Sequence, residues 1–218
     1  PKKRSDIVVI MFSSASRKNA EVTMDSLNRG AEEFVTKPEA TKTGMRESLE
    51  AVIEDLASKI RGLVRSRRGK REAGGAPAGE TGGPGRAGPV QPKKPVDKGE
   101  GIPSSFRPDL VVIGSSTGGP QALHSILSAV PAGKALNVPV VLVQHMAKGF
   151  TGPFAERLGA KGPFPWREAK DGEAVPTGTG LVAPGDFHLR LSRYTNRLTV
   201  NLGQDPRINS SRPAVHPL

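Results

Sequence analysis

Short apolar runs alternate along this chain with segments whose apolar residues have helical spacing. Residues 7–12, 110–113 and 138–143 consist mainly of apolar, largely β-branched side chains, a composition typical of buried strands in a parallel sheet. After each of the first two runs, apolar residues recur every three or four positions, which indicates an amphipathic helix. This alternation predicts an α/β fold.

Residues 1–67 have the pattern of half a doubly wound domain. The expected elements are a strand at 7–12 buried on both faces, a helix capped by Ser16 and ending near Gly30, a short strand at 34–36, and a long amphipathic helix from Met45 onward. A βαβα unit of this size is too small to close a hydrophobic core alone.

Residues 68–105 are expected to form a flexible linker between two domains, because glycine and proline crowd in and apolar residues nearly vanish. Between Arg61 and Lys98, ten basic and three acidic residues contribute +7 of the net charge of +11. This stretch has no aromatic residue on which nucleobases could stack. A solvated basic linker is therefore favoured over a nucleic-acid site, with contact to an acidic partner as the alternative.

Residues 106–218 are expected to form a second domain, which begins with a strand, a glycine-rich turn and a helix. The turn holds Gly114-x-Ser116-x-Gly118, the pattern that places a nucleophilic serine at the carboxyl edge of a sheet. Such turns also bind phosphate. A dinucleotide site would want an acidic residue after the next strand, where this chain has Gln144 and His145, and the Gly-Lys-Ser/Thr of a Walker loop is absent.

Ser116 and His145 are expected to lie side by side, because each follows one of two parallel strands joined by a helical crossover. A serine within hydrogen-bonding reach of a histidine is the nucleophile and general base of acyl transfer. The backbone N–H groups of Thr117 and Gly118 are the candidates for an oxyanion site at the start of the helix. Further along, residues 187–191 and 198–202 alternate around a turn and predict an antiparallel hairpin.

Four motifs in this order resemble one family, the chemotaxis protein-glutamate methylesterases, whose members carry an N-terminal response-regulator receiver domain. They are Gly114–Pro120, Val143–Met146, Ala183–Gly185 with His188, and Asn209–Pro213. The resemblance spans residues 1–67 and 106–218. It implies a serine esterase, with Ser116 as nucleophile and His145 as base, that hydrolyses glutamate γ-methyl esters on methyl-accepting chemoreceptors and deamidates specific glutamines. Hydrolysis would need no cofactor. The absence of cysteine fits the cytoplasmic location that the family implies, and no apolar run approaches the roughly 20 residues of a membrane span.

The receiver resemblance rests on Ser13 directly after a strand, Phe34 on the next strand, and Lys37-Pro38 at its end. In that family the hydroxyl and the lysine contact the phosphorylated aspartate, and the aromatic side chain changes position on activation. The resemblance implies a chemotaxis histidine kinase as phosphodonor, release of a block on the esterase site by phosphorylation, and Mg²⁺ at the phosphorylated site. The aspartate and the acidic metal ligands have no counterpart in this chain.

The chain departs from the methylesterase pattern in its third catalytic residue. The family's aspartate lies in a Met-Gly-x-Asp-Gly segment that is absent here, and Asp171, Asp186 and Asp205 are each interpreted as turn residues. Ser115 replaces a common alanine, His216 stands where an aspartate is usual, and His124 and His188 are interpreted as structural. We expect a fragment truncated at both ends, with little activity of its own. The alternative is a catalytically inactive fragment that binds receptors or partner proteins.

Overall fold

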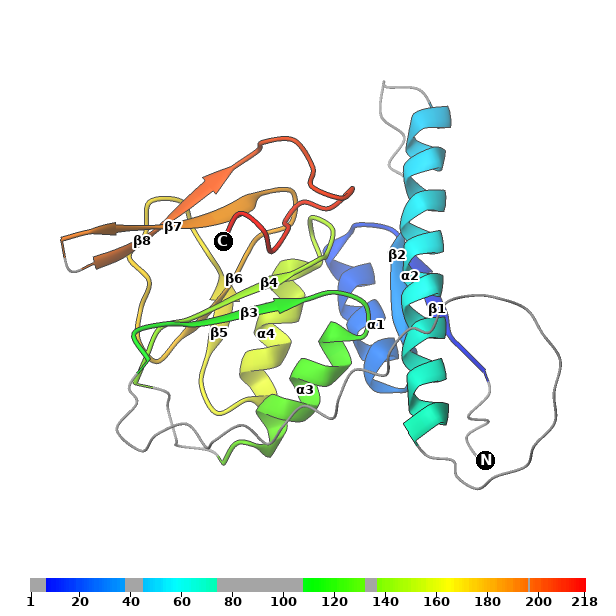
Figure 1. Ribbon diagram of the computed structural model, residues 1–218, viewed down its shortest axis with the longest axis horizontal. Helices are drawn as coiled ribbons and strands as arrows, with labels where there is room; N and C mark the ends of the chain where they lie inside the picture. The colour runs from blue at the N-terminus through cyan, green and yellow to red at the C-terminus, as the bar shows by residue number, and fades with distance from the viewer. Residues whose placement is uncertain (1–6, 38–44, 74–107, 132–136, 196) are drawn as a thin grey trace, which may run out of the picture.

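The computed structural model describes residues 7–37, 45–73, 108–131, 137–195 and 197–218. Its C-terminal part consists, in chain order, of β3 (Val111–Ser115), α3 (Gly119–Ala129), β4 (Val140–Gln144), α4 (Thr151–Lys161), β5 (Trp166–Glu168), β6 (Gly180–Val182), β7 (His188–Tyr194) and β8 (Arg197–Gly203). Four of the strands form a parallel sheet of order β3-β4-β6-β5. Figure 1 shows α3 and α4 on one face of this sheet and the β7-β8 hairpin on the other. The expected parallel-sheet α/β fold is confirmed for this part.

Strand β4 lies in the interior of this three-layer arrangement, and all five of its residues are buried. Because side chains alternate between the faces of a strand, Val140 and Leu142 pack against the helices, while Val141 and Val143 pack against the hairpin. At the edge of the sheet, Trp166 of β5 is 5% exposed and stacks on Phe164 with ring centroids 5.3 Å apart. The expected hairpin is present, with Tyr194 paired to Arg197 next to its turn.

The N-terminal part contains β1 (Ile10–Ser13), α1 (Arg17–Asn28), β2 (Glu33–Thr36) and α2 (Met45–Ala73). Strands β1 and β2 pair in parallel, and Ser16 caps α1 by accepting a hydrogen bond from the backbone N–H of Asn19. Gly30 closes that helix with a φ of 114°, a conformation that glycine adopts without steric cost. The predicted βαβα order is therefore present.

A single hydrophobic cluster joins the N-terminal part to the helical face of the C-terminal sheet. Met24 and Leu27 of α1 pack in it together with Leu123 of α3 and Phe154 of α4. Beside them, the rings of Phe34 and Phe150 stack with centroids 4.6 Å apart. The first half of the chain thus completes part of its core against the second half.

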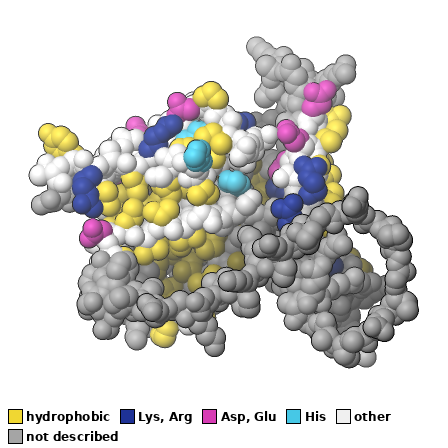
Figure 2. Space-filling view, viewed as in Figure 1, with side chains coloured by type: hydrophobic (Ala, Val, Ile, Leu, Met, Phe, Trp, Pro, Cys, Tyr) yellow, Lys and Arg dark blue, Asp and Glu magenta, His cyan; other side chains and the backbone are white. Residues whose placement is uncertain are grey.

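Three expectations about the N-terminal part need correction. The first strand is not buried on both faces: Val9 is 43% and Phe12 51% exposed, and among the described residues β1 pairs only with β2. Half of the apolar stripe of α2 is also exposed, and Figure 2 shows apolar side chains along the outer side of that helix; the exposed members are Leu49, Ile53, Ile60 and Val64. Finally, α2 continues to Ala73 and occupies the start of the segment expected to be a linker, whose remainder, 74–105, lies outside the described residues.

Helix α4 and strand β5 were not anticipated from the sequence. Helix α4 contains Gly152, Pro153 and Gly159, which have low helix propensity, so its apolar positions do not stand out as a helical pattern. Packing of Phe154, Ala155 and Leu158 against the sheet stabilises the helix instead.

Candidate active site

The turn between β3 and α3 has the geometry of a nucleophile elbow. Gly118, the N-cap of α3, has a φ of 76°, in the left-handed region that glycine occupies readily. A Cβ atom at Gly119 would lie 2.3 Å from Oε1 of Gln144 and 2.8 Å from Oγ of Ser115, so no larger residue fits. The chain therefore turns sharply at Ser116 and leaves its side chain exposed at the sheet edge.

The pairing of β3 with β4 brings Ser116 to His145. Ser115 pairs with Gln144 in the register, and the backbone N–H of His145 donates to the carbonyl of Ser115 at 3.1 Å, which extends the ladder by one hydrogen bond. The next residues along each strand therefore face each other. Oγ of Ser116 lies 3.1 Å from Nδ1 of His145.

Burial lowers the pKa of His145 below its ordinary value of 6.5, because the interior disfavours the charged imidazolium. The imidazole is then neutral near pH 7, and the tautomer protonated at Nε2 leaves Nδ1 free to accept the Ser116 proton. A hydroxyl beside such a nitrogen is the arrangement that activates a serine nucleophile.

The neighbouring hydroxyl of Ser115 has a different partner. It donates a hydrogen bond to Oε1 of Gln144, the residue at the end of β4. The amide group of Gln144 donates to the carbonyl of Ser116 at 3.1 Å and to that of His145 at 3.3 Å. Of the two adjacent serines, only Ser116 is therefore placed beside the histidine.

The predicted oxyanion donors lie where the two parts of the chain meet. The backbone N–H of Gly118 donates to Oε2 of Glu33, a buried β2 carboxylate, at 3.4 Å. Desolvation raises the pKa of Glu33, while the nearby Lys59 ammonium opposes that shift. The Thr117 side chain lies against Gly62 of α2, where an added Cβ would be 3.2 Å from it. An acidic group thus already occupies one side of the turn.

Comparison with known proteins identifies the C-terminal part. Residues 111–218 match the family model described as CheB methylesterase. Residues 111–218 belong to this family. The protein-glutamate methylesterase/protein-glutamine glutaminase 1 of Paramagnetospirillum magneticum is 37% identical over 96% of this chain and 56% of its own length. The protein of the same name, without the number, from Haloarcula marismortui is 35% identical over 95% of the chain and 56% of its own length.

A solved structure is also similar, the crystal structure of the Thermotoga maritima CheB methylesterase catalytic domain. It is 43% identical, and the match covers 51% of this chain and 58% of that one with a TM-score of 0.48. The chain spans about half the length of the curated relatives it matches.

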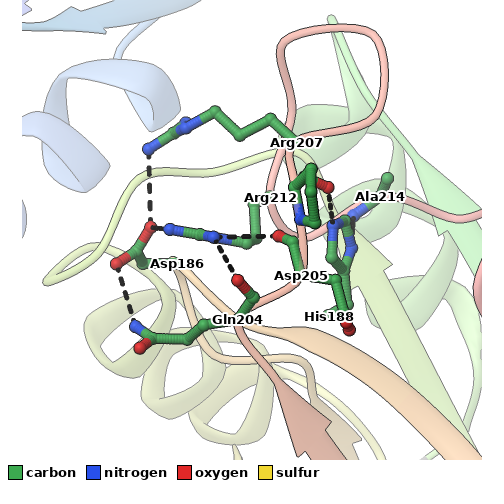
Figure 3. A network of polar contacts seen from close by, with 8 residues as sticks. Asp186, His188, Gln204, Asp205, Arg207, Arg212 and Ala214 are labelled. Atoms are coloured by element: carbon green, nitrogen blue, oxygen red, sulfur yellow. Dashed lines mark hydrogen bonds and ion pairs between the residues drawn. The ribbon is translucent and has the colours of Figure 1, made fainter.

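In the CheB methylesterase domain, the three aspartates singled out from the sequence each bond away from His145. Asp171 accepts from the backbone N–H of Leu202 at 2.8 Å, and Asp205 pairs with Arg190 at 2.6 Å. Asp186, with a φ of 72°, pairs with Arg212 at 2.6 Å (Figure 3). None of these three aspartates bonds to His145, whose ring contacts Oγ of Ser116 at 3.1 Å. These contacts fit the interpretation of the aspartates as structural residues.

The other histidines of the CheB methylesterase domain also lie outside the Ser116–His145 pair. His188 is fully buried, donates from Nε2 to the carbonyl of Pro206 at 3.1 Å and accepts at Nδ1 from the backbone N–H of Ala214 at 3.3 Å (Figure 3). This ring fastens the C-terminal segment to β7. His124 lies within α3, and His216 is exposed.

The structure brings together two of the three residues predicted for a receiver site. The backbone N–H of Lys37 donates to the carbonyl of Ser13 at 2.7 Å, at the carboxyl ends of β2 and β1. The ammonium of Lys37 lies 5.8 Å from the ring centroid of Phe12. Phe34 instead faces the CheB methylesterase domain, where it stacks on Phe150.

Two further properties concern the described residues as a whole. They contain no group of three or more His, Cys, Asp or Glu side chains placed to hold a metal ion. The Mg²⁺ ligands implied by the receiver resemblance are therefore not found among them. No helix in the described ranges is long and apolar enough to cross a membrane.

The sequence did not single out Gln144 or Glu33 for the site. For Gln144 a signal existed in the sequence, since a polar side chain ends an otherwise apolar strand. For Glu33 no local signal existed, because its contact with Gly118 joins residues 85 positions apart.

Proposed function

We propose that this chain is part of a protein-glutamate methylesterase, with residues 106–218 contributing the serine and the histidine of its active site. The observation that carries the proposal is the 3.1 Å contact between Oγ of Ser116 and Nδ1 of His145, at the carboxyl ends of two parallel strands. Such a pair performs acyl transfer by nucleophilic catalysis. The relatives' names, protein-glutamate methylesterase/protein-glutamine glutaminase, supply the substrate class.

In the proposed reaction, Oγ of Ser116 forms a bond to the carbonyl carbon of a glutamate γ-methyl ester while His145 takes the serine proton. The N–H groups of Thr117 and Gly118 stabilise the oxyanion. The C–O bond to the methoxy group then breaks, and His145 returns its proton so that methanol leaves. Water, deprotonated by His145, hydrolyses the acyl-serine and releases the glutamate carboxylate. With a glutamine side chain, the same steps release ammonia.

The substrates we propose are methyl-accepting chemoreceptors in the cytoplasm, because the ordered motifs resemble the chemotaxis methylesterases. The receiver resemblance of Ser13, Phe34 and Lys37 supports phosphorylation by a chemotaxis histidine kinase as the regulatory signal. A bound Mg²⁺ would neutralise phosphoryl charge in such a receiver, but the described residues supply no ligand set for it. No step above depends on a metal ion.

The proposed regulation acts through the contact of Glu33 with the N–H of Gly118. A carboxylate at 3.4 Å from this oxyanion donor competes with the substrate carbonyl for it. Replacing Glu33 with Gln removes the negative charge, and we expect faster modification of Ser116 by a fluorophosphonate. Glu32→Gln is the matched control, because Glu32 pairs with Arg67. Equal rates in both variants would contradict this proposal.

The esterase proposal is tested by fluorophosphonate labelling of the purified chain and by methanol release from methyl-labelled receptor membranes with the whole protein, since the chain spans about half the length of its relatives. We expect Ser116→Ala to abolish both and His145→Ala to abolish turnover. Ser115→Ala should reduce labelling only a few-fold, about the effect of one neutral hydrogen bond. His124→Ala serves as the histidine control. Labelling retained in Ser116→Ala would contradict the proposal.

A second candidate function is receptor or partner binding without turnover. It is favoured by the contacts of the three candidate aspartates, which pair with Leu202, Arg190 and Arg212 and not with His145. In serine proteases, an acid that can no longer fix the histidine tautomer costs about 10⁴-fold in turnover. The two candidates separate by experiment: a binding fragment would still associate with receptor membranes, but its Ser116 would react with fluorophosphonate no faster than Ser115.

A further inference from the structure

Gln144 is hydrogen-bonded to the backbone of both residues of the proposed active site. It is the last residue of β4, and its side chain is 2% exposed. A buried carboxamide without partners would be costly, so its hydrogen bonds indicate what it does here. One is donated to the carbonyl of Ser116 at 3.1 Å and another to the carbonyl of His145 at 3.3 Å.

These two carbonyls lie just beyond the regular ladder between β3 and β4. The last backbone hydrogen bond between the strands joins the N–H of His145 to the carbonyl of Ser115. After it both chains turn away, β3 into the elbow and β4 into the segment 145–149. The carboxamide of Gln144 therefore holds the two peptide groups together just beyond the last backbone hydrogen bond between the strands.

The orientation of the carboxamide is also determined. Carbonyl oxygens accept but cannot donate, so the NH₂ group must face Ser116 and His145. Oε1 then faces Ser115, whose hydroxyl donates to it. The missing side chain at Gly119 leaves the room for this oxygen, since a Cβ there would be 2.3 Å away.

We propose that Gln144 is a positioning residue that holds the Ser116 and His145 peptide groups in register, with the Ser115 hydroxyl fixing its orientation. The proposal rests on the proposed esterase function, in which the distance from Oγ to Nδ1 sets the reactivity of the serine. A misplacement of about 1 Å in such a pair can reduce the rate on the order of 10²-fold.

The experiment compares Gln144→Met with Gln121→Met in the purified chain. Gln121 is the matched control, because its amide also donates to two backbone carbonyls, those of Leu27 and Ala31, but away from the elbow. The readouts are the fluorophosphonate labelling rate of Ser116 against pH, and kcat and KM for p-nitrophenyl acetate. Circular dichroism checks that each variant is folded.

We expect Gln144→Met to lower the labelling plateau and kcat about 10- to 100-fold with KM within about threefold, at an unchanged midpoint pH. Gln121→Met should keep the wild-type plateau. Gln144→Glu should lower the plateau as well, because a carboxylate cannot donate hydrogen bonds to the carbonyls of Ser116 and His145. A merely structural residue would lower stability without a selective fall in kcat at unchanged KM and midpoint.

A plateau within twofold of wild type in folded Gln144→Met would overturn the proposal. If that variant does not fold, Gln144→Asn replaces it, since it keeps the amide but withdraws it by one methylene, and the same loss is expected. Failure of the esterase proposal would look different, because Ser116→Ala would then still be labelled.

Discussion

At the scale of single residues, the two adjacent serines of the elbow have the same hydroxyl group but different hydrogen-bond partners. The hydroxyl of Ser115 is held by Gln144, while that of Ser116 faces Nδ1 of His145. The sequence predicted the proximity of Ser116 and His145, because strand order and the carboxyl edge follow from the apolar pattern. The clamp by Gln144 depends on a side-chain orientation that no sequence spacing specifies.

The pH dependence of serine reactivity follows from the surroundings of His145. Because burial lowers its pKa, the neutral imidazole remains the main form to a lower pH than for an exposed histidine. We expect the labelling rate of Ser116 to rise through a midpoint below pH 6.5 and to stay constant above it. A pH–rate profile of fluorophosphonate labelling measures this, with His145→Ala as the pH-independent baseline. A midpoint above this value would indicate a carboxylate acting on the ring.

At the scale of elements, the loop after β6 supports the segment that carries the histidine. A Cβ atom at Gly185 would lie 2.4 Å from the backbone nitrogen of Lys148 and 2.5 Å from its Cα. The backbone N–H of Gly185 also donates to Oγ1 of Thr151 at 2.9 Å, at the start of α4. This close approach explains why the chain has glycine after Ala183-Pro184.

Gly185→Ala should therefore push the segment 147–148 away from the sheet edge and displace His145. Overpacking of this kind typically costs about 1–3 kcal/mol of stability, and we expect the labelling rate of Ser116 to fall about tenfold. Gly152→Ala in α4 is the control, because its added Cβ would meet Glu168 only at 3.5 Å, an ordinary contact. Thermal denaturation and labelling kinetics measure the two effects. Unchanged labelling in Gly185→Ala would show that the segment tolerates the displacement.

Element boundaries were the least predictable part of the fold. Strong apolar runs in the sequence located β3, β4 and the hairpin. Helix α4 was missed because Gly152 and Gly159 have low helix propensity, and it is packing against the sheet that stabilises this helix. For the first strand the sequence predicted too much burial: Phe12 is exposed, since an apolar side chain is buried only where another element covers it.

At the scale of the whole molecule, Phe34 connects the two parts of the chain. It is 2% exposed, stacks on Phe150, and lies 5.0 Å from the Lys59 ammonium. The domain order follows from the sequence, but this contact does not, because it joins residues more than a hundred positions apart.

Phe34→Ala should lower the free energy of unfolding by about 3–5 kcal/mol, the usual cost of removing a buried aromatic ring. Phe12→Ala is the matched control, since Phe12 is 51% exposed and its loss should cost about 0.5 kcal/mol. Chemical denaturation measures both. If Glu33 of β2 competes for the Gly118 N–H as proposed, Phe34→Ala should also speed the labelling of Ser116, and slower labelling would contradict that competition.

The single tryptophan is an intrinsic fluorescence probe for the unfolding of one part of this molecule. Trp166 is the only indole in the chain and is buried at the edge of the C-terminal sheet, so its fluorescence reports mainly on that sheet. Far-ultraviolet dichroism is weighted toward the other part, since α1 and α2 contain 12 and 29 residues against 11 each in α3 and α4. Coincident melting curves would mean that both parts unfold as one cooperative unit. In Phe34→Ala the dichroism should change at a lower temperature than the fluorescence. The difference between the two midpoint temperatures would measure how far the two parts had become independent.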